Sequence, residues 1–164
     1  MLLRHSPFSE YCLIYLKLKS MKPEKEKFRK ILFKASSENE KWMSELEFMQ
    51  DEQKFLEHLL SSHFLDLSTD KYYEPTKKLI QKLKNVEKMS NELSDLLQTH
   101  NKHLATLIES LQLKGKKEFK KEHKRIKSEF DHYSLNLKYV KKKIFSMIKD
   151  IMKSHKQKLL IAEE

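Results

Sequence analysis

The chain has 164 residues, with 34 Lys and Arg against 24 Asp and Glu, so its formal net charge at pH 7 is +10. One Gly and three Pro cannot supply the turns of a multi-stranded sheet, which excludes all-β and α/β folds. A single cysteine, Cys12, excludes an intramolecular disulfide and a zinc site built from several thiolates. The six-residue apolar run from Tyr11 to Leu16 is too short for a membrane span or a signal-peptide core, so we expect a cytoplasmic protein.

The first 22 residues differ from the rest of the chain. Pro7 interrupts their apolar pattern, and a regular helical spacing starts only after Met21. Two alternatives stay open. Either Met21 is the initiator and the preceding residues are disordered or a start-site artefact, or a short helix covers about residues 9–20 with its first serine as the cap. We therefore treat residues 1–22 as an N-terminal segment and residues 23–164 as one domain.

The remainder of the chain shows apolar residues in a four-three spacing, which is typical of helices that contact partner helices along their length. Pro23, Pro75 and Gly115 divide it into three pieces, and Pro favours a first helical turn while Gly favours the position past a helix end. The pattern predicts helices at about 23–64, 75–114 and 117–162. The predicted core series are Phe28, Leu32, Ala35, Asn39, Trp42, Leu46, Met49, Gln53, Leu56, Leu60 and His63; Leu79, Leu83, Val86, Ser90, Leu93, Leu97, His100, Leu104, Leu107 and Leu111; and Phe119, His123, Ile126, Phe130, Tyr133, Leu137, Val140, Ile144, Met147 and Ile151.

Short connections between long helices make neighbouring helices antiparallel, so we predict an all-α fold, an antiparallel three-helix coiled coil running up, down and up. Pairing outward from the turns gives three predicted layers: Leu32, Leu111 and Phe119; Trp42, His100 and Phe130; and Gln53, Ser90 and Val140. In pattern, the stretch from Pro23 to Ala162, with Trp42 in its first helix, resembles a spectrin-type repeat. That resemblance implies a spacer or docking rod.

Residues that could carry chemistry are sparse. Di-iron bundles repeat Glu-x-x-His on two helices, whereas this chain has the spacing once, at Glu129 and His132, off the core series. His100 and His103 are close enough to share a metal, but we expect no carboxylate to face them, so a metal-binding bundle around these two histidines is only a third alternative. No Gly-rich loop or strand-to-helix turn can present a nucleophile or hold a phosphate. We therefore predict no catalytic residue, no metal, no cofactor and no small-molecule substrate.

Charge is unevenly distributed along the chain. Residues 35–70 carry a net charge of −7 and residues 114–164 carry +9, which is complementary within one bundle. The basic excess follows the second helix and suits the phosphates of nucleic acid or an anionic membrane surface. Lysine is poor at bidentate recognition and no aromatic side chains are interleaved for stacking, so anion binding is our alternative function. Its predicted residues are Lys116, Lys117, Lys120, Lys121, Lys124, Arg125 and Lys127.

Two apolar stripes lie off the core series, one on the first helix and one on the third. The predicted register places both at the same end of the rod, near the connection at residues 64–74, and together they form a patch too large for a monomer to expose. We expect a second copy of the chain to cover it, with another helical protein or the folded-back connection as alternatives. The predicted function is non-catalytic protein association, as a homodimeric scaffold or adaptor. The predicted interface residues are Phe48, Phe55, Leu59, Phe145, Ile148, Met152 and Leu159.

Overall fold

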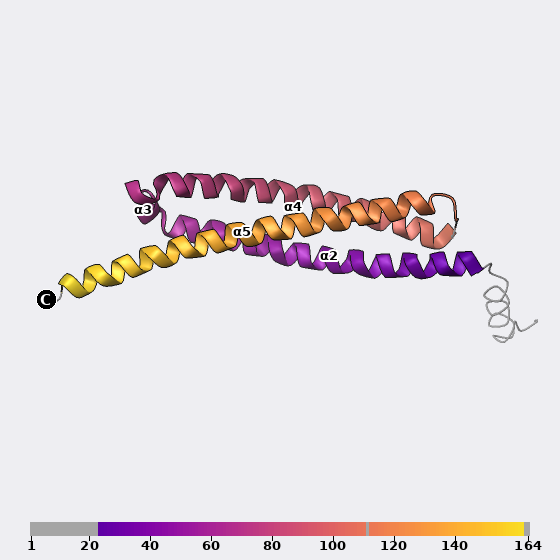
Figure 1. Cartoon of the computed structure of the whole chain (residues 1–164), viewed down its shortest axis with the longest axis horizontal. Coiled ribbons are helices and arrows are strands. Elements are labelled where there is room, and N and C mark those ends of the chain that lie inside the picture. Colours follow the sequence, from indigo (N-terminus) through magenta and orange to yellow (C-terminus); the bar gives the residue numbers. More distant parts are fainter. Residues whose placement is uncertain (1–22, 111, 163–164) are drawn as a thin grey trace, which may run out of the picture.

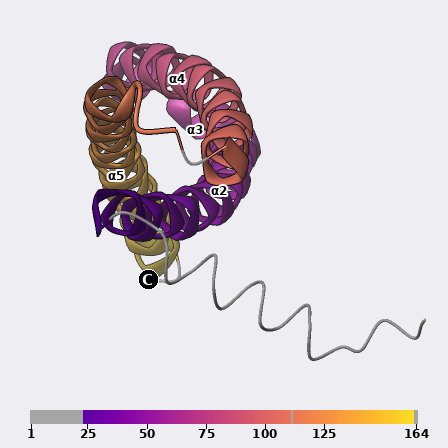
Figure 2. The ribbon, with the colours of Figure 1, turned by 90° about the vertical axis from the view of Figure 1, so that its right-hand side faces the viewer.

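The computed structural model describes residues 23–110 and 112–162, and all regular structure in them is helical. Three long helices, α2 (Pro23–Ser62), α4 (Asp70–Ser110) and α5 (Lys116–Ala162), lie side by side in a rod, with the short helix α3 (Phe64–Leu67) at one end (Figure 1). Viewed along the rod, the long helices surround one axis (Figure 2). The all-α prediction is confirmed. The described helices contain no apolar stretch long enough to cross a bilayer.

Local sequence explains two of the helix starts. α2 begins at Pro23, where a proline gives up no intrahelical hydrogen bond, and Glu24 and Glu26 favour the positive end of the helix dipole. Gly115 has a φ of 88°, in the left-handed region that side chains with a Cβ disfavour. Its carbonyl accepts a hydrogen bond from the Phe119 N–H at 2.9 Å. Gly115 therefore turns the chain into α5, which begins one residue earlier than expected.

The connection between α2 and α4 differs from the prediction. α2 ends at Ser62, and α3 then forms a single turn whose Leu67 is buried. α4 begins at Asp70, so Pro75 lies inside the helix and not in its first turn as expected. Proline there only leaves one carbonyl near the helix start without its usual donor, which the helix tolerates. The predictions for residues 1–22 and for Leu111 fall outside the described residues.

The core consists mainly of the predicted series, nearly all of which is buried. One apolar cluster extends from Trp42 to the α3 end of the rod, and a smaller one surrounds Phe28 and Phe119 at the α4–α5 turn. Near the middle, the Tyr133 hydroxyl donates a hydrogen bond of 3.0 Å to the buried Gln53 Oε1. Polar groups are thus part of the packed interior. The buried polar residues are Asn39, Gln53, Thr76, Ser90 and His100.

The position of α4 along α5 differs from the predicted register. Trp42 on α2 stacks on Phe130, with ring centroids 6.0 Å apart, as the predicted layer requires. His100 on α4, however, lies against Phe119 and His123, with ring centroids 5.5 and 5.2 Å away, about one heptad before Phe130. The physical reason is that α4 ends at Ser110. Residues expected in its last turn form the connection instead, which shifts α4 along its neighbour.

Candidate functional site

An apolar patch lies across α2 and α5 toward the α3 end of the rod. On α2, Phe48 and Phe55 are 67% and 54% exposed, and on α5, Phe145 and Met152 are 44% and 61% exposed. The rings of Phe55 and Phe145 have centroids 6.4 Å apart. The two predicted stripes therefore meet in one surface, and these four residues are called the apolar patch below.

The other predicted interface residues are not part of this patch. Ile148 is only 5% exposed and belongs to the core, so its assignment to the exposed stripe is wrong. In a straight helix, residues seven positions apart point in directions that differ by about 20°. Four heptads after Phe119 this difference has added up, so the residue after Met147 takes the core position. Leu59 is partly buried against the core. The side chain of Leu159 lies outside the described residues.

The connection between α2 and α4 leaves the apolar patch exposed. Its Leu67 is buried, and the Tyr72 hydroxyl donates a hydrogen bond of 2.6 Å to Asp150. Phe64 and Tyr73 instead line a groove of about 660 Å³ between α2 and α4. The alternative in which this connection folds back over the patch is therefore wrong.

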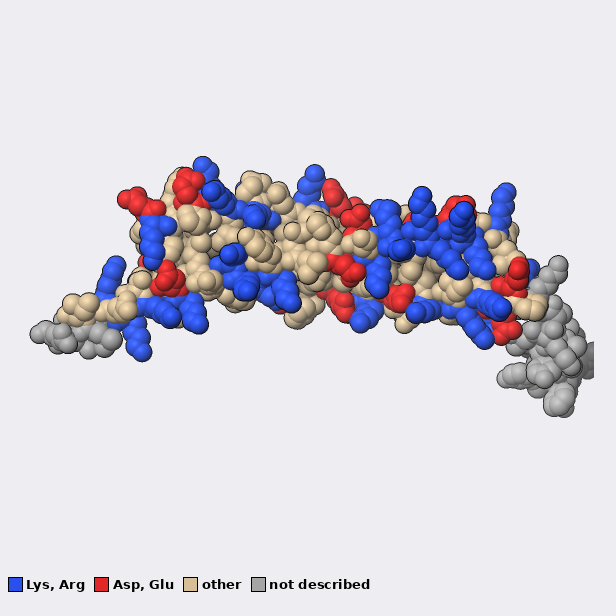
Figure 3. All heavy atoms as spheres, in the orientation of Figure 1, with Lys and Arg blue, Asp and Glu red and all other residues tan. Residues whose placement is uncertain are grey.

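The predicted anion-binding residues lie on the opposite half of the rod. Six of the seven are exposed, and the Lys116 ammonium lies 5.8 Å from the Phe28 ring centroid. Figure 3 shows Lys and Arg side chains gathered over this half. Within the described part of the chain, none of the seven has a carboxylate oxygen within 4.0 Å. The positive charge of this surface is therefore not compensated by ion pairs.

A polar network lies inside the same half of the rod and links the three long helices. His123 Nε2 is 2.9 Å from a Glu38 carboxylate oxygen, and His123 Nδ1 is 2.9 Å from His100 Nε2. The His100 ring is fully buried and stacks on Phe119. Trp42 packs against His123 with centroids 5.0 Å apart. Aromatic rings thus enclose a hydrogen-bonded chain from Glu38 to His100.

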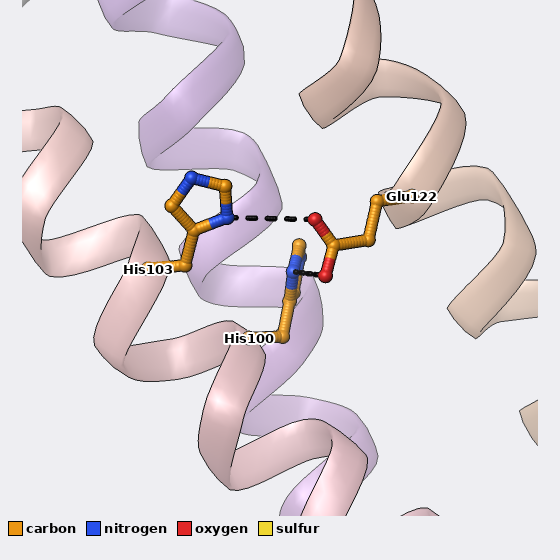
Figure 4. A group of neighbouring side chains, drawn as sticks. All are labelled: His100, His103 and Glu122. Atoms are coloured by element: carbon orange, nitrogen blue, oxygen red, sulfur yellow. Dashed lines mark ion pairs between the residues drawn. The ribbon is translucent and has the colours of Figure 1, made fainter. Parts of the chain in front are cut away.

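Glu122 on α5 faces His100 and His103 on α4 (Figure 4). Its two oxygens lie 3.9 Å from His100 Nδ1 and 3.4 Å from His103 Nδ1. The expectation that no carboxylate faces these histidines is wrong, because the predicted register placed His100 level with Phe130. One signal was available in the sequence. His103 and Glu122 lie nearly equally far from the α4–α5 turn, so a short turn brings them together.

The charge states in the network follow from burial and hydrogen bonding. Desolvation lowers the pKa of His100 to about 4, His123 and His103 act in the same direction, and Glu122 opposes them. The pKa of Glu38 lies below its usual value because its carboxylate accepts a hydrogen bond from His123. At neutral pH, His100 is therefore uncharged and Glu38 is ionised.

Comparison of the chain with protein-family models, with curated proteins and with solved structures finds no match. The resemblance to a spectrin-type repeat therefore stays a prediction from sequence pattern. The function has to be argued from the apolar patch, the basic surface and the histidine network.

Proposed function

We propose that this protein is a non-catalytic rod of three antiparallel helices that forms a homodimer through the apolar patch. The observation that carries the proposal is the contact between Phe55 and Phe145, which joins two exposed stripes into one surface. At about 200 Å² per large side chain, the exposed fractions of the four residues amount to roughly 450 Å². Patches of this size are often functional.

The size of the patch shows how much of an interface it could form. One side of a standard protein interface buries about 800 Å², so the patch supplies roughly half of it and the flanking helix surfaces supply the rest. We therefore expect a reversible dimer whose population depends on concentration within the range of ordinary solution experiments.

The charges beside the patch fit a second copy of the chain. Residues 43–62 of α2 carry five acidic side chains and one basic one, whereas residues 135–162 of α5 carry eight basic side chains and one acidic one. A twofold axis along the rod places α2 of each copy against α5 of the other, with acidic against basic surface on both sides. This arrangement accounts for the apolar stripes and for the charge asymmetry together.

Sedimentation velocity of the untagged chain at several concentrations tests the proposal. We expect the dimer fraction to rise with concentration and to fall as salt screens the charged flanks. The double variant Phe55→Lys and Met152→Lys should be monomeric with unchanged helix content. A wild-type chain that is monomeric throughout, or a double variant that dimerises as well as the wild type, contradicts the proposal.

The matched control is the double variant Phe33→Lys and Leu135→Lys. Its two side chains are 54% and 66% exposed, similar to Phe55 and Met152, and it adds the same charge. Each lies at least about 15 Å along its helix from the nearest patch residue, at about 1.5 Å per residue. We expect this control to dimerise like the wild type.

A second candidate function is anion binding by the segment from Lys116 to Lys127, supported by the lack of ion pairs at its seven predicted basic residues within the described part of the chain. The triple variant Lys120→Gln, Lys121→Gln and Lys124→Gln should weaken binding of duplex DNA or phosphatidylserine vesicles. For DNA, the slope of log affinity against log salt should fall by about 2.7 if all three lysines contact phosphates. The control variants are at Lys77, Lys78 and Lys84, exposed lysines on α4. Absence of binding by the wild type at low salt rejects this candidate.

A further inference from the structure

His100, His103 and Glu122 bring three potential metal ligands together between α4 and α5 (Figure 4). One ligand atom from each residue lies within 4.8 Å of the other two. The closest pair, His103 Nδ1 and a Glu122 oxygen, is 3.4 Å apart, about the separation of two ligands on a tetrahedral zinc ion with bonds of about 2.0–2.1 Å. The side chains of His103 and Glu122 are 45% and 33% exposed, so small rotations can complete the geometry.

The hydrogen bonds of the network bear on which nitrogen of His100 is free. An ionised Glu38 can only accept, so His123 donates its Nε2–H to that carboxylate. In the tautomer that leaves His100 Nδ1 free to bind a metal, His123 Nδ1 accepts the hydrogen of His100 Nε2 across a contact of 2.9 Å. In this tautomer the Nδ1 atom of His100 has a lone pair and no hydrogen.

This lone pair has no partner. His100 is 0% exposed, and among the described residues no hydrogen-bond partner reaches its Nδ1. The atom faces a Glu122 oxygen at 3.9 Å, so two electron-rich groups point at each other. A buried polar atom without a partner needs an explanation, and a cation between the two groups provides one.

We propose that the chain binds a divalent transition-metal ion of the zinc class through His100 Nδ1, a ring nitrogen of His103 and the carboxylate of Glu122. Imidazole and carboxylate ligands suit Zn²⁺, and three protein ligands leave a fourth position for water or another small ligand. Because the ligands come from both sides of the α4–α5 turn, the bound ion ties these two helices together beside their connection.

The remainder of the network supports the proposed ligand set. The second ring nitrogen of His100, Nε2, is hydrogen-bonded to His123, and His123 donates a hydrogen bond to Glu38. Outer hydrogen bonds of this kind fix the tautomer and the orientation of a metal-bound histidine. The stacking of the His100 ring on Phe119, with an interplanar angle of 7°, holds the ligand plane as well. The site therefore has one fixed ligand and two adjustable ones.

The surrounding charges predict an unusual salt dependence. The exposed side chains of Lys121, Lys124 and Arg125 lie on the same turns of α5 as Glu122 and repel a cation. Added salt screens this repulsion, so zinc affinity should rise in a non-coordinating salt. Polyanion binding by the same segment should instead fall with salt. One salt series therefore separates the two kinds of ligand.

Calorimetric titration of the untagged, metal-free chain with Zn²⁺ tests the proposal. We expect one ion per chain and a higher Tm in its presence, and Co²⁺ should give the visible absorption of a tetrahedral site with nitrogen and oxygen ligands. His103→Ala and Glu122→Gln change partly exposed side chains and should each weaken binding by at least about tenfold. His123→Gln should weaken zinc binding by about 10- to 100-fold, because it removes the hydrogen bonds that orient His100.

Two variants serve as matched controls. Glu118→Gln makes the same charge change one helical turn before Glu122, and His58→Ala removes an exposed histidine on α2. Both should bind Zn²⁺ like the wild type, and circular dichroism of each metal-free variant checks that the helices persist. A wild-type chain that does not bind Zn²⁺ overturns the proposal. So does unchanged affinity in both His103→Ala and Glu122→Gln.

Discussion

The two ends of this rod contain different kinds of interior. Toward α3, aliphatic side chains such as Ile144 fill the core, and neighbours such as Phe145 leave apolar surface outside it as well. Toward the α4–α5 turn, His100 and His123 lie between aromatic rings and bond to each other, and His123 also bonds to the Glu38 carboxylate. Aliphatic packing tolerates many arrangements, whereas a buried polar network has to be satisfied in one geometry. The aliphatic end therefore depends on packing and the histidine end on one register, and the proposed association and ligand binding are divided between the same two ends.

The largest effect should come from the aliphatic end. Ile144 is fully buried and Phe145 beside it is 44% exposed. Ile144→Ala should lower the free energy of unfolding by about 2–5 kcal/mol because it leaves a cavity, whereas Phe145→Ala should lower it by less than about 1 kcal/mol. Urea unfolding at a concentration where the chain is monomeric measures both. Equal losses would show that Phe145 is part of the core and would weaken the comparison.

The histidine end should instead respond to pH. The pKa of His100 is about 4 in the folded chain and 6.5 ordinarily, so protonation favours the unfolded state. The contribution of His100 to stability is therefore fully present above pH 6.5 and is lost as the pH falls from 6.5 toward 4. Between pH 7 and pH 4.5, the free energy of unfolding should therefore fall by about 2 kcal/mol.

The groups that face His100 act on the same equilibrium. His123 and His103 lower its pKa and Glu122 raises it. Urea unfolding at both pH values, with chelator present, should therefore compare the wild type with His100→Gln, which keeps the neighbouring groups. Between these two pH values, the free energy of unfolding should fall by about 2 kcal/mol less in the variant than in the wild type. Parallel losses in the two proteins would assign the pH dependence to other groups.

The middle of the rod should show a smaller effect. The Tyr133 hydroxyl donates to the buried Gln53, so Tyr133→Phe leaves that amide oxygen without its partner. We expect a loss of about 1–2 kcal/mol in the free energy of unfolding. Burial also raises the pKa of Tyr133 to about 12, so ultraviolet titration should show one late tyrosine ionisation that the variant lacks. An unchanged titration curve contradicts this assignment.

The sequence alone was enough to predict most of the helical interior. A four-three spacing depends only on local side-chain polarity and helix geometry, which explains why Phe28, Leu97 and Ile126 are buried as expected. The sequence predictions fail where small deviations in helix geometry add up along the chain. Ile148 entered the core because the helix rotates slightly with each heptad. Pro75 marked the wrong helix start because a proline is also tolerated a little further inside a helix.

The carboxylate of the candidate metal site was missed for a related reason. Spacing places His100 on the buried face of α4 but does not determine which residue of α5 lies opposite. That depends on where α4 ends and on how Gly115 turns the chain, and a shift of one heptad changes the neighbour from Phe130 to His123, next to Glu122. The apolar patch was easier to predict, because α2 and α5 kept the expected register.

The smallest effect should come from the ion pair beside the apolar patch. Lys141 Nζ lies 2.8 and 3.0 Å from the two Glu52 oxygens, with side chains 33% and 27% exposed, and joins acidic α2 to basic α5. In the monomer, Lys141→Met should lower the free energy of unfolding by at most about 1 kcal/mol. Lys54 belongs to a far more exposed ion pair, so Lys54→Met should have no measurable effect on it.

A double-mutant cycle between Lys141 and Glu52 isolates this contribution from side effects of each change. A coupling free energy above about 1 kcal/mol in the monomer would mean that the α3 end also depends on polar contacts, and the contrast between the two ends would no longer hold. A small coupling in the monomer that grows at concentrations where the chain dimerises would place the pair at the edge of the interface. There a second copy excludes water and strengthens the attraction between the two charges.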